Sequence, residues 1–155
     1  NKIYITHFHG DHIGGLVQEG QPVFANATLY VGSVEYKAWI EEMPEERNGQ
    51  QREAMEAYKD RLVFFEFGDT LPHNVIALDA IGHTPGHTAF EKGELLILGD
   101  LMHGAALQME HPEFNANFDM DKAKAAESRV RIIKYAREKG LTMAGMHLPE
   151  PAFMK

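Results

Sequence analysis

Short apolar runs, separated by polar segments that contain glycine, recur along the chain and predict a series of β-strands. Most of these runs are rich in β-branched or aromatic residues, and all are short enough for a strand rather than a long helix. The predicted strands cover residues 2–6, 28–31, 62–67, 75–82, 94–99 and 141–146. Because helical segments lie between them, these strands favour the α/β class.

Apolar residues about one helical turn apart predict three helices, over residues 33–42, 49–60 and 121–139. The apolar faces of the first two would be formed by Val34, Ala38 and Trp39, and by Ala54, Met55 and Tyr58. The apolar face of the third would be Ala123, Ala126, Val130, Ile133 and Ala136. Asp119 or Asp121 can cap the start of the third helix, and Gly140 can end it in the left-handed conformation.

Three histidines and an aspartate lie within the six residues after the first predicted strand, in His7-Phe8-His9-Gly10-Asp11-His12. Imidazole nitrogens bind zinc and similar metals, and a carboxylate can share the site. Side chains alternate in an extended segment, so His7 and His9 point the same way and can hold one ion. Gly10 lets the chain turn, so that Asp11 and His12 can face a second ion. The pattern indicates a metal-ligand cluster built for two ions.

Further candidate ligands follow other apolar runs. They are His83, His87, Asp100 and His147. In open α/β sheets, functional groups gather at the carboxyl ends of strands. Several strand ends that each carry a histidine or an aspartate therefore predict one shared metal site.

These motifs resemble the signatures of the metallo-β-lactamase-fold hydrolase superfamily. Thr6 to Gly15 matches T-H-x-H-x-D-H-x-G-G at every fixed position, and Gly82 to His87 matches G-H-T-P-G-H. The resemblance covers essentially the whole chain and implies an αββα sandwich. Because the first signature normally follows several strands, we interpret residues 1–155 as a single domain that is a fragment lacking the first strands. Its open sheet edge would favour a homo-oligomer.

The resemblance also implies two divalent metal ions, with Zn²⁺ expected and Mn²⁺ or Fe²⁺ as alternatives. The ligands of the first ion would be His7, His9 and His87, and those of the second Asp11, His12 and His147. Asp100 would bridge the two ions, and His83 would be structural. Coordination lowers the pKa of water to about 7, so a hydroxide held between the ions can attack the substrate. Asp11, which would orient the hydroxide, and Asp100 are the candidate catalytic residues.

The segment after Asp100 is similar to the branch that includes methyl parathion hydrolase and lactonase-like enzymes. This similarity implies a small-molecule ester, lactone or phosphotriester as substrate. A thioester hydrolase of the glyoxalase II type and a β-lactamase are alternative enzymes. A non-catalytic metal-binding module is the alternative of another class, and it predicts lost ligands, whereas the motifs here are intact.

Other residues have a structural interpretation beside a functional one. For His103, contact with substrate or a ligand and a purely structural role fit the sequence equally well. His73 and His111 are expected at the surface, and Trp39 in the core. Either a substrate pocket or the core would contain the large apolar residues after Asp100, which are Met102, Leu107, Met109, Phe114 and Phe118.

Composition narrows the choice of partners. The net charge of -8 argues against nucleic acid, which binds clustered Lys and Arg. The 44% hydrophobic content can build a core, and no apolar run approaches the ~20 residues of a membrane span. Cysteine is absent, which excludes disulfides and leaves the location open. The resembled branch is typically exported, which suggests export, with the cytoplasm as the alternative location.

Overall fold

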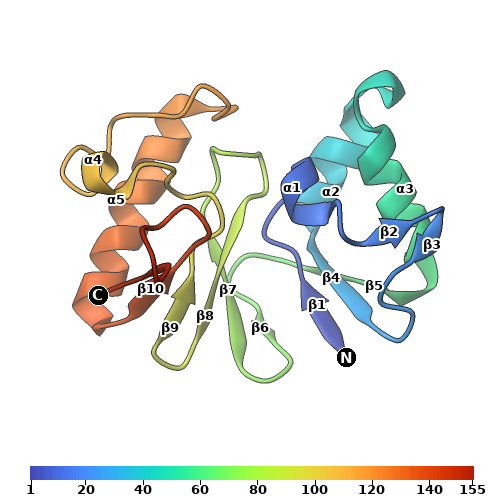
Figure 1. Ribbon diagram of the computed structural model, residues 1–155, viewed down its shortest axis with the longest axis horizontal. Helices are drawn as coiled ribbons and strands as arrows, with labels where there is room; N and C mark the ends of the chain where they lie inside the picture. Colours follow the sequence, from blue (N-terminus) through green and yellow to red (C-terminus); the bar gives the residue numbers. More distant parts are fainter.

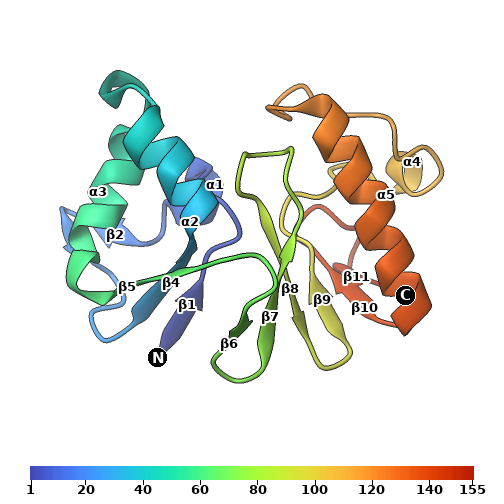
Figure 2. The same cartoon turned by 180° about the vertical axis from the view of Figure 1, so that it is seen from behind.

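The computed structural model describes residues 1–155 and contains two main β-sheets flanked by helices (Figure 1, Figure 2). The smaller sheet has three parallel strands in the order β1-β4-β5. They are β1 (Lys2–Tyr4), β4 (Thr28–Gly32) and β5 (Leu62–Phe65). Strand β1, which precedes the histidine-rich segment, lies at one edge of this sheet.

The larger sheet has six strands in the order β11-β10-β9-β8-β7-β6. Its neighbours are antiparallel except for the parallel pair β9 and β10. The strands are β6 (Thr70–Leu71), β7 (Val75–Asp79), β8 (Thr88–Lys92), β9 (Leu95–Ile97), β10 (Thr142–Ala144) and β11 (Phe153–Met154). Two short strands, β2 (Val17–Gln18) and β3 (Gln21–Pro22), pair separately.

Helices cover the outer side of each sheet, so the layers follow the order αββα (Figure 1). Beside the smaller sheet lie α1 (Gly10–Ile13), α2 (Ser33–Tyr36) with its π-helical continuation η1 (Lys37–Glu42), η2 (Glu45–Arg47), α3 (Gly49–Ala57) and η3 (Lys59–Arg61). Beside the larger sheet lie α4 (Ala105–Gln108) and α5 (Lys122–Lys139). None of these helices combines the length and apolar character needed to cross a bilayer.

The core follows from the alternation of side chains along the strands. In β4, Leu29 and Val31 belong to a cluster with helix residues such as Met55, whereas Tyr30 faces the other way. Tyr30 joins a cluster between the sheets that also contains Phe65, Leu71, Val75, Ala77 and Phe90. A third cluster of 13 buried residues lies between the larger sheet and α5. The apolar interior is therefore divided among the three spaces between the four layers.

The predicted strands all fall on strands of the structure, although the one predicted over 75–82 ends at Asp79. The helices predicted over 33–42 and 49–60 are confirmed as α2 with η1 and as α3 with η3. Strand β8 was not predicted, because its sequence Thr-Ala-Phe-Glu-Lys ends in two charged residues and directly follows a motif interpreted as a loop.

Helix α5 has the predicted ends but a different buried face. Asp121 caps it by accepting a hydrogen bond from Lys124 N at 3.0 Å, and Gly140 ends it at a φ of 67°. The buried residues are Ala125, Ser128, Arg129, Ile132, Ile133 and Ala136. Val130, predicted inside, is 51% exposed. The prediction is confirmed for Ile133 and Ala136 and wrong for Ala123 and Val130, because the buried face turns to include Ser128 and Arg129.

Candidate metal centre

The histidine-rich segment leaves β1 between the two sheets. Thr88 N donates to Thr6 O at 2.9 Å, which ties the end of β1 to β8 of the other sheet. His7 therefore emerges in the interior, where it is fully buried. Helix α1 follows at once, and its first turn carries Asp11 and His12.

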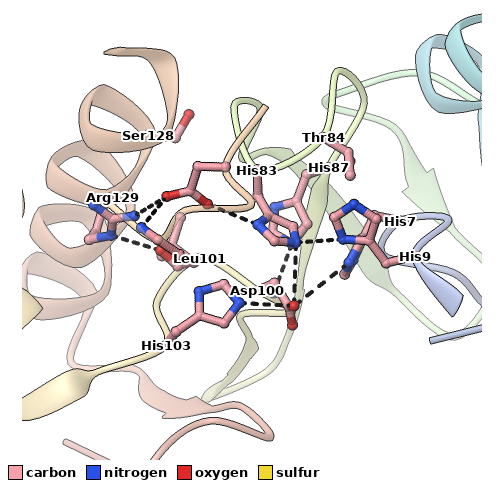
Figure 3. Close-up of polar contacts among 12 residues, drawn as sticks. His7, His9, His83, Thr84, His87, Asp100, Leu101, His103, Ser128 and Arg129 are labelled. Carbon is pink, nitrogen blue, oxygen red and sulfur yellow. Dashed lines mark hydrogen bonds and ion pairs between the residues drawn. The ribbon is translucent and has the colours of Figure 1, made fainter. Parts of the chain in front are cut away.

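Asp100 lies at the centre of the histidine cluster (Figure 3). It follows β9, and only 3% of its surface is exposed. Its Oδ1 lies 3.0 Å from Nε2 of His12. Its Oδ2 lies near Nε2 of four further histidines: His103 at 3.1 Å, His83 at 3.4 Å, His147 at 3.5 Å and His7 at 3.8 Å. One buried carboxylate thus collects histidines from loops of both sheets.

A group of four side chains brings its donor atoms within 4.8 Å of one another: His7, His9, His83 and Asp100. His9 Nδ1 and His83 Nε2 are 2.8 Å apart. On His7, Nδ1 lies 3.1 Å from the hydroxyl of Thr6, so that Nε2 faces the group. Three imidazoles and a carboxylate form a donor set suited to zinc.

His87 lies outside this group, and here the geometry differs from the expectation that it is the third histidine ligand. Its Nδ1–H donates to Ala80 O at 2.9 Å, and its Nε2 accepts the backbone N–H of Asp100 at 2.9 Å. Burial lowers the pKa of His87 to about 3. Gly99 allows the contact, because its φ is +57° and a Cβ there would lie 2.5 Å from His87 Nε2. His87 thus binds the backbone of Asp100, and His83 is the histidine of this motif that joins His7, His9 and Asp100.

The ring of His83 is held from behind by Asp119. Its Nδ1–H faces Asp119 Oδ1 at 2.9 Å, which leaves Nε2 directed at the cluster. Asp119 also accepts a hydrogen bond from Ala116 N at 2.9 Å. Burial alone would raise the pKa of Asp119, but its hydrogen bonds and the Arg129 guanidinium hold it below the usual value. The carboxylate therefore fixes which nitrogen of His83 is free.

Arg129 extends this support to α5. Its guanidinium lies 3.5 Å from Asp119 Oδ2, and both side chains are fully buried. The guanidinium also donates to the carbonyl of Leu101 at 2.8 Å (Figure 3). A second bond runs to the carbonyl of Phe114 at 2.9 Å, in the same loop after Asp100. This role of Arg129 was not predicted from the sequence. The signal that could have indicated the burial of Arg129 is its position one helical turn before Ile132 and Ile133, on the same face of α5.

Asp11 and His12 form a second group with Asp100, again within 4.8 Å. Asp11 Oδ2 lies 3.6 Å from His12 Nε2, and the Asp11 side chain is 59% exposed. His147 reaches Asp100 in a third group that includes His103, whose ring centroid is 4.6 Å from that of His147. The structure thus brings together every ligand expected from the sequence except His87, and adds His83 and His103.

The pKa shifts of His7, His9 and Asp100 favour the forms that bind metal, whereas that of His12 favours its protonated form while no ion competes. Burial, reinforced by neighbouring imidazoles, lowers the pKa of His7 and of His9. Burial would raise the pKa of Asp100, but its contacts with His103 and His12 hold it well below its usual range. At His12, burial lowers the pKa, and Asp100 and Asp11 together raise it by more. Neutral imidazoles and an ionised carboxylate are the forms that bind metal.

Several polar atoms of the cluster are buried without a hydrogen-bond partner from the protein. They are Nε2 of His7, His12 and His147, Nδ1 of His103, and Oδ1 of Asp100. Each such atom costs about 1–3 kcal/mol if it stays unsatisfied. Converging imidazole lone pairs and a carboxylate oxygen are what a divalent transition metal satisfies, so the residues present fit the two ions expected from the sequence.

A cavity of about 190 Å³ opens at this cluster. It is lined by His9, Asp11, His83, Asp100, His103, Phe118 and His147. Phe118, the apolar member of the lining, is 56% exposed, and its ring centroid lies 4.6 Å from that of His103. A small molecule that reaches the cluster would meet this ring.

The remaining residues divide between core and surface. Trp39 is buried in the core as predicted, although its ring also lies 5.6 Å from that of His9. His73 and His111 are exposed, as predicted. Of the large residues after Asp100, Met102 is buried in the core, while Phe114 and Leu107 are about half exposed.

The αββα layers and the histidine and aspartate cluster at the strand ends define a protein of the metallo-β-lactamase type. The chain belongs to the metallo-beta-lactamase superfamily, whose family model matches residues 1–147. This match confirms both the fold class and the resemblance found in the sequence.

Solved structures similar to the chain are hydrolases and lactonases. AbOPH, a hydrolase in the beta-lactamase superfamily, has a TM-score of 0.87 and 29% identity over 99% of this chain and 58% of that chain. AidC, a dizinc quorum-quenching lactonase in complex with a product, N-hexanoyl-L-homoserine, has a TM-score of 0.84 and 28% identity over 98% of this chain and 58% of that chain. A probable metal-dependent hydrolase from Staphylococcus aureus shares the fold, with a TM-score of 0.78 and 22% identity over 94% of this chain and 53% of that chain.

The chain spans less than two thirds of the length of these solved structures. No curated protein sequence matches it.

Proposed function

We propose that this chain carries the metal site of a hydrolase that uses two divalent ions, zinc first among them, to cleave an ester, lactone or phosphotriester. The observation that carries the proposal is the convergence of unpartnered histidine nitrogens on one buried carboxylate, Asp100, beside a cavity. Membership of the superfamily and the likeness to the dizinc lactonase AidC support it.

The proposed ligands follow the geometry of the donor atoms. The first ion would be held by His7, His9 and His83, and the second by Asp11, His12 and His147, with Asp100 shared between them. His83 is preferred to His87 because its Nε2 faces the cluster, whereas Nε2 of His87 already accepts a backbone N–H. Mn²⁺ and Fe²⁺ are alternatives that accept the same nitrogen and oxygen donors.

When bound, the two ions supply a nucleophile derived from water at neutral pH and polarise the oxygen of the scissile group. The residues of the chain provide position and shape. Asp100 is buried and contacts proposed ligands of both groups, so it would hold the two groups together when the ions are bound. Asp11 is exposed at the cavity and can accept a hydrogen bond from the attacking water. Phe118 offers an aromatic face to an apolar part of the substrate.

Among substrates, a lactone is the first choice because AidC, at 28% identity, is a lactonase. A thioester hydrolase or a β-lactamase would use the same ligands, so these remain the alternative enzymes. A non-catalytic metal-binding module is less favoured, because the ligand set is intact and Asp11 is exposed at the cavity.

A substrate panel tests the proposal. The purified protein, loaded with zinc or manganese, is assayed on lactones, aryl esters, phosphotriesters, thioesters and β-lactams. We expect turnover of a lactone or ester that falls at least about 100-fold in Asp100→Ala and in Asp11→Ala, because both act on the reacting centre. Asp60→Ala, a change at an exposed aspartate in η3, is the control and should keep the wild-type rate.

Metal content is measured on the same samples. Two bound ions without turnover of any substrate would favour the non-catalytic module. A wild-type rate in Asp100→Ala with one bound ion would refute the two-metal proposal. Preference for a thioester or a β-lactam would move the assignment to the corresponding alternative.

A further inference from the structure

Glu35 is a buried acidic residue that contacts two of the loops bearing proposed ligands. It lies in α2 and is only 1% exposed. Glutamate is almost never fully buried unless it is paired. The partners of Glu35 are uncharged hydrogen-bond donors from distant parts of the chain. A buried carboxylate held in this way points to a specific task.

The two carboxylate oxygens of Glu35 accept hydrogen bonds from different loops. Oε1 accepts the N–H of Phe8 at 2.8 Å, and Phe8 stands between the first two histidines of the site. Oε2 accepts the hydroxyl of Thr84 at 2.9 Å and the N–H of Gly86 at 2.8 Å, in the turn directly after His83. One loop follows β1 of the smaller sheet, and the other joins β7 to β8 of the larger sheet.

The second loop is also pressed against α2 itself. A Cβ at Gly86 would lie 2.2 Å from the backbone nitrogen of Glu35, so only glycine fits the turn there. Thr84 is fully buried beneath this contact. The start of α2 therefore sets the separation of the two loops.

We propose that Glu35 is a positioning residue of the metal site, which holds the loop of His7 and His9 and the loop of His83 so that their three rings meet. The inference rests on the proposed function, because the role of these rings is to bind metal. His9 and His83 come from different sheets, yet their facing nitrogens are 2.8 Å apart. The carboxylate of Glu35 binds the backbone of both segments at once.

A glutamine cannot reproduce this arrangement. The amide has one acceptor oxygen, and whichever way it is turned, its NH₂ group faces a backbone N–H, that of Phe8 or that of Gly86. One loop then loses its acceptor. Burial raises the pKa of Glu35 to about 6, so at neutral pH the native side chain is ionised and both oxygens accept.

The test compares metal binding by the wild type, Glu35→Gln and a control, Glu91→Gln. Glu91 is a buried glutamate of β8 that contacts Tyr135 and Lys139 of α5 and has no contact with the histidines. Dissociation constants are measured for Zn²⁺ by competition with a chelator, and the visible spectrum is recorded with Co²⁺. We expect Glu35→Gln to weaken binding about 10- to 100-fold and to change the cobalt spectrum. Glu91→Gln should change neither.

Each outcome decides between the hypotheses. Wild-type affinity and an unchanged spectrum in Glu35→Gln would overturn the positioning role and leave the proposed function standing. A wild type that binds no metal would overturn both. An equal loss of affinity in Glu91→Gln would show that general loosening of the fold, and not the position of Glu35, governs binding.

Thr84 gives a second test that does not depend on the folding of Glu35→Gln. Thr84→Val removes one donor to the carboxylate at nearly constant volume, and Thr84→Ser keeps the hydroxyl. We expect a several-fold loss of zinc affinity in Thr84→Val and near wild-type affinity in Thr84→Ser. Equal affinities for Thr84→Val and the wild type would overturn the inference.

Discussion

Removing the carboxylate of Asp119 should destabilise the fold through Arg129 as well as disturb the site through His83. Both side chains of the Asp119–Arg129 pair are fully buried, 3.5 Å apart. Loss of one partner from a buried pair typically costs about 3–5 kcal/mol, because the other charge is left uncompensated. Arg129 keeps its backbone carbonyl partners, including Leu101 O. We therefore expect Asp119→Ala to lower the free energy of unfolding by about 3 kcal/mol, the lower end of that range.

The assay is urea unfolding of the metal-free protein in a double-mutant cycle with Arg129→Met. In the Arg129→Met background Asp119 is itself a buried charge without its cation, so Asp119→Ala loses hydrogen bonds but also relieves that penalty, and it should cost no more than about 1 kcal/mol. The difference is a coupling free energy of about 2 kcal/mol or more. The matched control is Asp79→Ala. Asp79 also faces an arginine of α5, Arg131, at 3.4 Å, but both side chains are substantially exposed, so this change should cost no more than about 1 kcal/mol.

Two results would refute this reasoning. One is a cost of Asp119→Ala that does not exceed that of Asp79→Ala. The other is the same cost in the wild type and in Arg129→Met, which would mean that the two buried side chains stabilise the fold independently. Zinc affinity measured on the same variants separates stability from the site, because His83 loses its carboxylate partner whether or not Arg129 is present.

Three further predictions use other parts of the structure. The pKa of Glu35 is raised from 4.5 to about 6 in the folded state, so its contribution to stability is present below pH 4.5 and is lost as pH rises through 6. The free energy of unfolding of the wild type, relative to that of Glu35→Gln, should therefore fall by about 2 kcal/mol from pH 4 to pH 7. A difference that does not change with pH would contradict this prediction. Gly82→Ala should lower the free energy of unfolding by on the order of 3 kcal/mol or more, because φ is +126° and a Cβ would lie 2.0 Å from the backbone of α5. In the same urea titration, the control Gly15→Ala should change it by no more than about 0.5 kcal/mol, because a Cβ at Gly15 would meet nothing within 4 Å. Zinc at 100 times its dissociation constant should raise the free energy of unfolding by about 2.7 kcal/mol. At the same zinc concentration, His83→Ala should lose more of this stabilisation than His87→Ala. The reverse order would restore His87 as the proposed ligand.

The parts of the site that could be predicted from the sequence are those fixed by local rules. His7 and His9 share a direction because they are two residues apart in an extended segment. Asp100 and His147 could be placed near them because each ends a short apolar run, and the ends of neighbouring strands meet. Spacing and residue type are enough for such inferences.

The choice between His83 and His87 could not be made locally. Both are histidines of one motif, and what separates them is the partner of the second ring nitrogen. For His83 that partner is Asp119, 36 residues further along the chain. For His87, the nitrogen that would have faced an ion accepts the N–H of Asp100. Only the folded chain shows these two pairings.

The burial of Glu35 and Arg129 was not predicted from the sequence, for a related reason. A charged residue in an amphipathic helix is usually solvated, whereas Arg129 lies on the buried face of α5. In the structure both residues are buried because each binds backbone groups of a loop that carries a ligand or follows one. Their burial depends on contacts far away in sequence, such as the glycine turn at Gly86.

The two buried groups act on the loop of His83 from opposite outer layers. Glu35 reaches it from α2 through Thr84 and Gly86, and Arg129 reaches it from α5 through Asp119. The first fixes the backbone of the loop and the second fixes the tautomer of the ring. Because these are different degrees of freedom without a shared contact, their effects on metal affinity should combine nearly additively. A strongly non-additive result would mean that one layer supports the ring only through the other.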